Sequence, residues 1–413
     1  MRVLFITPYL PNRLRTRPFN LLKQLAERHE ITLLSPVFNA QERCEAQQLQ
    51  QTLPDLVVTT VFCAKLTSLA RGLRAGLGRR SMQAHYCYSP ALVKTARYLL
   101  EAGHYDLIHI EHFRAAYLGR ELAFSGVPIV YDAVDSISLL VERTLRHGPL
   151  KQRLVSWLEL APTRRYEGEL ISEGYFEQVC ATSREDAAAL EKLAGLKSGG
   201  EQVKIIPNGV NTAEFAPPLP GTRREPATAI FTGKMSYHSN AAAARYLVKE
   251  IWPRVRLARH DARLWIVGSR PPADLLAYSG RNGIEVTGYV PDLALYLNRA
   301  TLAVAPLVYS VGIQNKVLEA LACATPTIAS DQVSRSVNVI SGRDLYLVPA
   351  GQPAAFARQI IELFENPEQA AAIGQAGRDF VLREHTWPEA SRQLEALWTA
   401  VRANPAAFVR AVS

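Results

Sequence analysis

Residues 302–330 read LAVAPLVYSVGIQNKVLEALACATPTIAS. We predict a strand that ends at Pro306, a turn containing glycine, a helix that begins near Asn315, and another strand. Lys316 and Glu319 are three residues apart, on one face of the first helical turn. Free amides at the helix N-terminus and the Lys316 ammonium attract an anion, while the Glu319 carboxylate can accept hydrogen bonds from a ribose diol. The segment therefore predicts a phosphate and ribose clamp; the alternative is an amphipathic helix with an i,i+3 salt bridge.

Strand-like and helix-like segments alternate on both sides of this clamp, in two series. Such alternation predicts an α/β fold in which helices cover parallel sheets. The predicted strands are 2–7, 30–35, 56–62, 105–110, 128–131 and 178–181, then 203–206, 229–232, 263–267, 285–287, 302–305 and 326–329. The predicted helices are 18–28, 90–102, 241–259, 293–298, 315–323, 353–365, 367–384 and 387–401, with one more capped by Ser183. Ligands of open α/β sheets bind beyond the carboxyl ends of the strands, so functional residues are expected just after strands.

The composition is that of a globular chain with a large core, because 48% of the 413 residues are apolar. The five cysteines are scattered and form no CxxC pair, so the sequence predicts neither a disulfide framework nor a zinc site and fits a reducing cytoplasm. The opening residues, MRVLFITPYLP, lack the features of a signal peptide. No uninterrupted apolar run reaches about 18 residues, so no membrane span is expected.

The net charge of +9 is concentrated in part on residues 65–80, KLTSLARGLRAGLGRR, which contain five cations and no acid. Their leucines recur at helical spacing, which is typical of a basic amphipathic helix. This stretch is interpreted either as an ordinary packed helix with a solvated face or as a contact for an anionic membrane or lipid phosphate. No nucleic-acid motif accompanies the charge, so a nucleic-acid partner is not expected.

Several motifs follow one another in an order that resembles the retaining glycosyltransferases of family four, which have the GT-B fold. The family signature E-A-[ML]-A-x-[GA]-x-P is matched by residues 319–326, EALACATP. Supporting motifs are IPNGVN at 206–211, FTGK at 231–234, LWIVG at 264–268, VTGYV at 286–290, and Gly377-Arg378 with Trp387 near the end. The resemblance covers nearly the whole chain and is strongest from 179 to 390.

This resemblance implies two Rossmann-like domains that face each other across a cleft. We place an acceptor-binding domain at 1–202, a domain that binds the nucleotide-sugar at 203–385, and a C-terminal helix at 386–413 that packs back on the first domain. The donor-binding residues that it implies are Gly233, Lys234, Gly268, Tyr289, Gly312, Gln314, Asn315, Lys316 and Glu319. Lys234 and Lys316 are expected to share the diphosphate of the donor.

The chain departs from the family pattern at three places. Many members carry a glutamate at the position of Val311, where it contacts the hydroxyls of the donor sugar; this sequence instead resembles a subgroup with a Gly-x-x-x-Lys turn, met by Gly312 and Lys316. A second family lysine is replaced near Ser239-Asn240. The third departure is the loop 8–20, which lacks the family's glycines.

That loop, PYLPNRLRTRPFN, carries Arg13, Arg15 and Arg17 and no acid. Pro18 suits a first helical position, which places Arg17 at the helix cap, where a cation opposes the helix dipole. A bound anion would relieve this conflict. We therefore interpret the three arginines as a phosphate or acceptor loop, with a plain solvated loop as the alternative.

Segment 104–114, HYDLIHIEHFR, resembles the strand end at which the family places a histidine or an acid against the donor. Alternation along a strand puts Ile108 and Ile110 on one face, and His109 and Glu111 on the other. Glu111 and His112 are the two candidates for positioning the sugar or acceptor, and His109 is more simply structural. Farther along, Asp132 and Asp135 follow another strand and are candidates to line the cleft; the alternative is a cap of the next helix through Asp135 or Ser136.

The reaction implied is transfer of a sugar from a nucleoside diphosphate sugar to a carbohydrate or lipid-linked acceptor, with retention and without a metal. Lys234, Lys316 and helix amides would stabilise the leaving diphosphate, and no DxD motif lies in a suitable place. Bacterial surface polysaccharide synthesis, in the cytoplasm or at the inner face of the membrane, is the expected setting. The alternatives are a nucleotide-sugar epimerase of the same architecture and a non-catalytic subunit of a polysaccharide assembly complex. A dinucleotide dehydrogenase is disfavoured because no G-x-G-x-x-G follows a first strand.

Overall fold

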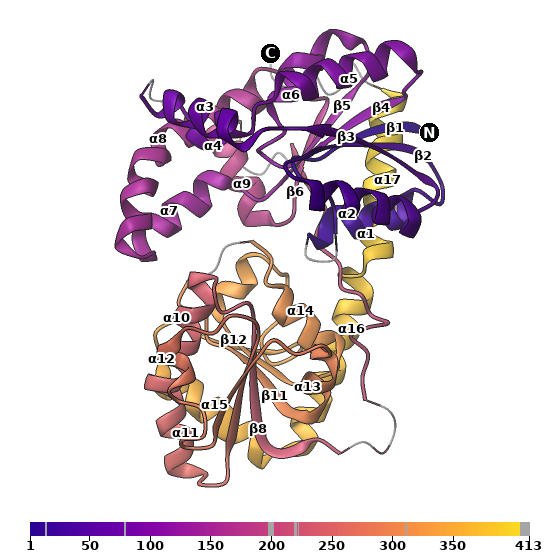
Figure 1. Cartoon of the computed structure of the whole chain (residues 1–413). Helices are drawn as coiled ribbons and strands as arrows, with labels where there is room; N and C mark the ends of the chain where they lie inside the picture. Colours follow the sequence, from indigo (N-terminus) through magenta and orange to yellow (C-terminus); the bar gives the residue numbers. More distant parts are fainter. Residues whose placement is uncertain are drawn as a thin grey trace. The chain divides into compact units, whose positions relative to one another are not determined.

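The computed structural model describes residues 1–12, 15–77, 80–196, 202–218, 221, 223–309 and 312–404. The chain divides into two compact units (Figure 1). The first unit contains residues 1–207 together with the chain from Trp387 onward, and the second contains Asn208–Thr386. Among the described residues, no helix is both long and apolar enough to cross a membrane.

The first unit is built on a seven-stranded sheet whose strands are all parallel, in the order β3-β2-β1-β4-β5-β6-β7. Its strands are β1 (Arg2–Ile6), β2 (Glu30–Val37), β3 (Leu56–Phe62), β4 (Leu107–Glu111), β5 (Ile129–Val134), β6 (Gln178–Ala181) and β7 (Val203–Ile205). The strand order reverses direction between β1 and β4. Chain connections leave this point on opposite sides, which makes it the switch point of the sheet.

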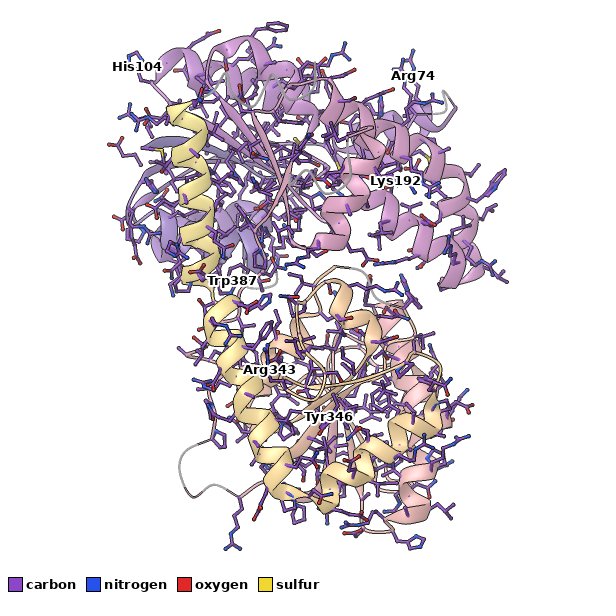
Figure 2. The ribbon with its side chains drawn as sticks, turned by 180° about the vertical axis from the view of Figure 1, so that it is seen from behind. Arg74, His104, Lys192, Arg343, Tyr346 and Trp387 are labelled. Carbon is purple, nitrogen blue, oxygen red and sulfur yellow. The ribbon has the colours of Figure 1, made fainter. Side chains whose placement is uncertain are left out.

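Helices cover both faces of this sheet. One face packs α1 (Thr16–Leu25), α2 (Ala40–Thr52) and α17 (Trp387–Ala403) against Val3, Phe5, Leu107 and Val130. The other face packs α5 (Pro90–Ala102), α6 (Tyr117–Leu122), the end of α8 (Leu150–Ser172) and α9 (Arg184–Leu193) against Leu4, Ile6, Ile108 and Tyr131. Burial on both faces explains why the central strands read as continuous apolar runs. Figure 2 shows Trp387 at the start of α17, which lies against α1.

Three further helices, α3 (Lys65–Leu77), α4 (Met82–Cys87) and α7 (Ile137–His147), lie with α8 at one end of the first unit (Figure 1). The helix α7 begins where a cap at Asp135 or Ser136 was offered as an alternative, whereas α8 was not predicted. Pro162 lies inside the continuous helix α8, and the large apolar residues from Leu150 to Leu158 do not face a core. The apolar residues of this region therefore do not form the stripe of a helix that packs on a core, which is the pattern used to predict helices. The helix α2, of 13 residues, was also missed.

The second unit has a six-stranded parallel sheet in the order β10-β9-β8-β11-β12-β13. Its strands are β8 (Glu225–Thr232), β9 (Arg263–Val267), β10 (Ile284–Gly288), β11 (Ala300–Ala305), β12 (Thr327–Ser330) and β13 (Tyr346–Val348). Its helices are α10 (His238–Tyr246), α11 (Trp252–Ala258), α12 (Ala273–Leu276), α13 (Leu293–Arg299), α14 (Asn315–Ala322), α15 (Pro353–Glu365) and α16 (Pro367–Glu384). The switch point lies between β8 and β11.

Two sequence-based boundaries require correction. The segment predicted to open the second series, 203–206, forms β7 and pairs with β6 at the edge of the first sheet. Its Ile206 is also buried in the core of the first unit, so the chain changes unit after Pro207. The helix predicted at 241–259 is divided by a π-helical turn, Leu247–Ile251, which joins α10 to α11.

Candidate functional site

Loops that follow β8, β9 and β10 are joined by backbone hydrogen bonds at the carboxyl end of the second sheet. The Gly233 amide donates to Val267, and the Gly268 amide donates to Gly288, at 3.0 and 2.9 Å. Both Gly233 and Gly268 have positive φ, and a Cβ on Gly268 would lie 1.8 Å from the Gly233 carbonyl oxygen. Glycine is required at Gly268 because no side chain fits this approach of two backbones.

Lys234 directly follows β8 at this switch point, and its side chain is exposed. The loop that carries it is held by Asn240, whose amide donates to the Lys234 carbonyl at 3.0 Å. Ser239 donates to the Tyr309 carbonyl, which ties α10 to the loop after β11. The residues that replace the second family lysine, Ser239 and Asn240, are thus buried and structural.

The first turn of α14 lies at the other side of the same switch point, after β11. Its N-cap, Gln314, forms no side-chain cap, so the first amides of the helix have no cap from this residue. Gly312, two residues earlier, has a positive φ of 61° that allows the tight approach to the helix. This arrangement agrees with the helix predicted from Asn315.

Lys316 and Glu319 occupy one face of that first turn, and each changes its pKa on burial. Loss of water around the Lys316 ammonium lowers its pKa to about 8, against the opposing effect of the Glu319 carboxylate. Burial raises the pKa of Glu319 to about 7, and Lys316 acts in the opposite direction. The Lys316 ammonium donates to Gln314 Oε1 at 2.9 Å. The site therefore presents a cation and an ionisable carboxyl in a poorly solvated place, which suits an anionic ligand with a diol.

Two more predicted donor residues lie at this edge. Asn315, the first residue of α14, has a buried side-chain oxygen with no hydrogen-bond partner in the structure. Tyr289 follows β10, and its ring is exposed. The second unit thus brings the predicted glycines, Lys234, Lys316 and Glu319 to the carboxyl end of one sheet.

In the first unit, Arg17 is not at a helix cap as predicted. The helix α1 begins at Thr16 with Arg15 as its N-cap, and Arg17 points into the protein. Its guanidinium donates from Nε and Nη2 to Asp132 Oδ2, at 2.9 and 2.6 Å. Both partners are buried, so the Arg17 guanidinium neutralises the Asp132 carboxylate of β5 and is not available to an anionic ligand in this arrangement.

Glu111 ends β4 on the same sheet face as this ion pair. Its side chain is 1% exposed, and neither carboxylate oxygen has a hydrogen-bond partner in the structure. Burial, followed by the charge of Asp132, raises the pKa of Glu111 well above its usual value. Burial therefore favours the protonated, uncharged form of the Glu111 carboxyl.

His112 follows Glu111 in a left-handed conformation, with φ of 73°. Such a backbone is strained for a residue with a side chain, and strain of this kind is concentrated at functional sites. Burial lowers the pKa of His112 to about 3, and the Arg114 amide donates to its Nδ1 at 3.2 Å. His112 is thus a neutral imidazole with Nε2 as its donor. Its ring meets Tyr9 edge to face, at 5.8 Å between centroids.

Tyr9 follows β1 and connects His112 to the arginine loop. The Arg15 guanidinium lies 4.4 Å from the centre of the Tyr9 ring and donates to the Leu10 carbonyl at 3.0 Å. Tyr9, Arg15 and His112 therefore gather at the switch point between β1 and β4. The position of Arg13 lies outside the described residues, as does that of Val311.

The other polar residues near these strand ends have structural partners. The His109 ring stacks on Phe5 at 4.3 Å and its Nδ1 accepts from Trp398 at 3.2 Å, which fits the structural interpretation. Its place opposite Ile108 and Ile110 confirms the predicted alternation of β4. Ser136 is the N-cap of α7, and Asp135 beside it accepts from Thr182. Burial and the charge of Asp186 raise the pKa of Asp135 to about 7.

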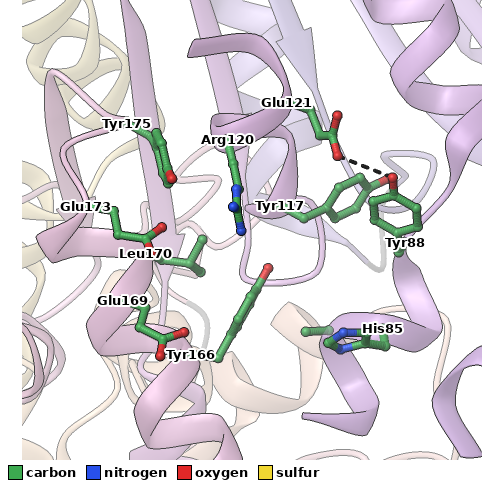
Figure 3. Close-up of a pocket in the computed structure, with 11 residues that line it drawn as sticks. His85, Tyr88, Tyr117, Arg120, Glu121, Tyr166, Glu169, Leu170, Glu173 and Tyr175 are labelled. Carbon is green, nitrogen blue, oxygen red and sulfur yellow. Dashed lines mark hydrogen bonds between the residues drawn. The ribbon is translucent and has the colours of Figure 1, made fainter. Parts of the chain in front are cut away.

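A pocket of about 200 Å³ that the sequence did not predict lies on the opposite face of the first sheet (Figure 3). The helices α4, α6 and α8 line it with tyrosines and charged side chains: His85, Tyr88, Tyr117, Arg120, Glu121, Tyr166, Glu169, Glu173 and Tyr175. Tyr88 donates to Glu121 at 3.2 Å. Aromatic rings with polar groups are a common lining for organic ligands.

The basic stretch 65–80 forms α3 over most of its length. Arg74 is exposed, as Figure 2 shows, and so is Leu69. The side chains of Lys65, Leu66, Leu73 and Leu77, and residue Arg79, lie outside the described part of the structure. Within the described ranges, no three His, Cys, Asp or Glu side chains group closely enough to hold a metal ion.

Two family models match the chain, one in each unit. Residues 16–214 match the model described as Glycosyltransferase Family 4, and residues 226–366 match the one described as Glycosyl transferases group 1. Together they cover most of both sheets.

Individual proteins agree with these models. EpsD of Bacillus subtilis (strain 168), named as a glycosyltransferase, is 24% identical over 71% of this chain and 76% of its own length. The phosphatidyl-myo-inositol mannosyltransferase of Mycobacterium leprae (strain TN) is 25% identical over 76% of this chain and 78% of its own. The crystal structure of Anabaena HepE in complex with UDP aligns with a TM-score of 0.68 over 97% of this chain and all of that one, at 14% identity. This last likeness shows a shared fold.

Proposed function

This chain belongs to the glycosyltransferases of family 4 (group 1), and from that membership we propose that it moves a sugar from a nucleoside diphosphate sugar to an acceptor hydroxyl. The observation that carries the proposal is the first turn of α14. There Lys316 and Glu319 share one face, at the switch point of the second sheet and beside Lys234 across it. A diphosphate binds the ammonium groups and helix amides, and the ribose diol binds Glu319.

Lys316 and Lys234 would stabilise the charge that develops on the leaving diphosphate, the work that a metal does in other transferases. We therefore propose that transfer needs no metal. The product keeps the anomeric configuration of the donor, as in the retaining members that the motif resembles. No protein nucleophile is required when the acceptor attacks on the face of the leaving group.

In the first unit, His112 is the side chain that we assign to the sugar or acceptor. It is more accessible than Glu111, its backbone is strained, and its neutral ring offers an Nε2 donor. Glu111, directly before it, is buried, and its raised pKa favours the uncharged carboxyl, which would not repel the donor phosphates. Arg15 contributes a cation for a phosphorylated group at the same strand end.

The solved structures of HepE with UDP and with UDP-glucose support a nucleotide-sugar as the donor of this fold. We propose a carbohydrate or lipid-linked acceptor, in bacterial surface polysaccharide or glycolipid synthesis on the cytoplasmic side of the membrane. The exposed Arg74 on α3 is compatible with a contact between 65–80 and anionic lipid.

Calorimetry with UDP-, GDP- and ADP-sugars tests the donor site directly. One of them should bind the wild type and bind Lys316→Ala much more weakly, while exposed Lys249→Ala should bind like the wild type. Incubation of the bound donor with and without acceptor then separates the reactions. A new sugar nucleotide formed without acceptor would show an epimerase, and binding of none of the three would remove the donor site as assigned.

The pKa values of the clamp predict how nucleotide binding depends on pH. Below about 7 Glu319 takes up a proton and loses its charge, and above about 8 Lys316 loses its proton. Affinity should therefore be highest between these values and fall on both sides by up to about tenfold per pH unit. Glu319→Gln should abolish the acidic decline only. An unchanged acidic decline in that variant would show that another group titrates.

A further inference from the structure

The first half of α8 faces the protein with polar side chains and faces solvent with apolar ones. Five large apolar side chains between Leu150 and Leu158 are 51% to 81% exposed: Leu150, Leu154, Val155, Trp157 and Leu158. We call them the α8 surface. The side chains on the opposite side of the same helix are Ser156, Glu159, Thr163 and Glu167, each 6% exposed or less. Spacing at about 100° per residue places Leu150, Leu154, Trp157 and Leu158 opposite the buried polar group, with Val155 at the border between the two faces.

The buried polar face is fixed by hydrogen bonds. Glu159 accepts from the Met82 amide at 2.8 Å and from the Ser81 hydroxyl, at the start of α4. Glu167 accepts from the Ile137 and Ser138 amides at 2.6 and 2.9 Å, at the start of α7. Each glutamate thus satisfies the first amides of a neighbouring helix.

Rotation of α8 to bury its apolar face would move Glu159 and Glu167 into solvent. The first amides of α4 and α7 would then lose their hydrogen-bond partners. The outward position of the α8 surface is therefore imposed by the packing of the first unit. Contiguous apolar surface of this kind on a protein marks a place of interaction. Trp157, one of its five residues, has an apolar ring with one polar N–H, the type of side chain that lies at the boundary between lipid and water.

The exposed charged side chains on this stretch of α8 are all positive, and Glu142 of the neighbouring α7 is paired with Arg146 and Arg164. Lys151, Arg153 and Arg165 are exposed on the same stretch of helix. Between residues 148 and 166 the sequence contains one acid, Glu159, and its carboxylate is buried against α4. The basic helix α3 packs on α4, at the same end of the first unit (Figure 1). An apolar stripe with a cationic rim complements an anionic lipid surface.

From these observations we propose that the α8 surface docks the protein on an anionic membrane, with the apolar side chains in the interface and the rim cations at the lipid phosphates. A second copy of this chain fits less well. A twofold interface would place the same cationic rim on both partners, so that like charges meet. The proposal does not depend on the donor site, because binding to lipid is measured without transfer.

Co-sedimentation with lipid vesicles tests this directly. Full-length protein should sediment with vesicles of equal parts phosphatidylcholine and phosphatidylglycerol, and less with phosphatidylcholine alone or in high salt. The double variant Leu154→Ser/Trp157→Ser should bind the mixed vesicles about tenfold or more weakly, because each side chain contributes buried apolar area. Phe124→Ser removes an apolar side chain that is 96% exposed elsewhere in the first unit, and it should bind like the wild type.

A second variant, Lys151→Glu/Arg165→Glu, keeps the apolar residues and should lose the preference for phosphatidylglycerol. Nucleotide binding and the thermal midpoint of each variant show that it is folded. Vesicle binding that is absent in the wild type, or equal in the wild type and Leu154→Ser/Trp157→Ser, would overturn the proposal. So would a stable dimer in solution that Trp157→Ser dissociates, because the partner would then be a second copy.

Discussion

At the switch point of the second sheet, the charged residues that we assign to the donor come mainly from one stretch, 312–319, on a loop and the first turn of a helix. At the switch point of the first sheet, the corresponding residues come from Tyr9 and Arg15 after β1 and from Glu111 and His112 after β4. Beneath them lies a buried ion pair, Arg17 with Asp132. The same place in two related sheets is thus occupied by a local motif in one and by an assembled cluster in the other.

The two sites differ in how much their side chains contribute to the stability of the unit that carries them. The Lys316 ammonium donates to Gln314, only two residues away, so a change at Lys316 removes little that holds the unit together. Arg17 and Asp132 are separated by 115 residues and join α1 to β5 inside the core. We therefore expect substitutions in the second sheet to alter binding, and substitutions in the first to alter stability as well.

The largest expected effect is on the stability of the first unit. Arg17→Met should lower the free energy of unfolding by about 3–5 kcal/mol, because it leaves the Asp132 carboxylate buried without its partner. Arg17→Met/Asp132→Asn should lose less than Arg17→Met alone, since the uncompensated charge is gone. Chemical denaturation of the three proteins measures this. If Arg17→Met has the same free energy of unfolding as the wild type, the first switch point does not stabilise its unit, and the proposed contrast between the two switch points is wrong.

Lys316→Ala should have the next largest effect, on transfer and not on folding. Loss of a charge that stabilises the leaving diphosphate should lower kcat/KM by about 100- to 1,000-fold. The denaturation midpoint should stay near that of the wild type. Steady-state kinetics beside Lys249→Ala checks both statements. Full activity in Lys316→Ala would mean that the clamp at α14 does not hold the donor.

The same contrast explains what the sequence could predict. All the chemistry of the α14 clamp lies within eight residues, so helix propensity and spacing alone place Lys316 and Glu319 on one face, and the helix begins at Asn315 as predicted. Most of the strands were likewise predicted from apolar runs. Arg17, in contrast, was assigned to a helix cap because nothing near it in sequence indicates that its partner is Asp132.

The helix α8 was missed for a related reason. Secondary structure was predicted from apolar residues that face a core, whereas α8 buries Glu159 and Glu167 and exposes Trp157. The partners that justify the two buried glutamates are the first amides of α4 and α7, which become neighbours only in the folded chain. The strand β7 was assigned to the wrong unit because a short strand does not reveal its sheet.

A smaller effect is expected at His112. His112→Ala should lower kcat by about 100-fold, the range of a positioned proton donor or acceptor, while donor affinity measured by calorimetry changes little. His104→Ala is the matched control, because His104 is exposed at the surface of the same unit (Figure 2). A variant His112→Ala that loses donor affinity but keeps kcat would move His112 into the binding site and weaken the division between the units.

The smallest effect, and the most specific, concerns Glu111. Its pKa is raised in the folded protein, so the folded state holds a proton that the unfolded chain releases above the usual carboxyl pKa. Stability is then greatest at low pH and falls as pH rises toward the folded pKa, by up to about 1.4 kcal/mol per pH unit for this one group. Glu111→Gln keeps the shape without the titrating proton, so its free energy of unfolding should fall less steeply as the pH rises above the usual carboxyl pKa, while the other buried acids contribute equally to both proteins. If the free energies of unfolding of the two proteins change in parallel with pH, Glu111 is ionised in the folded protein. The first switch point would then carry a negative charge beside His112, and the role assigned to His112 would have to be revised.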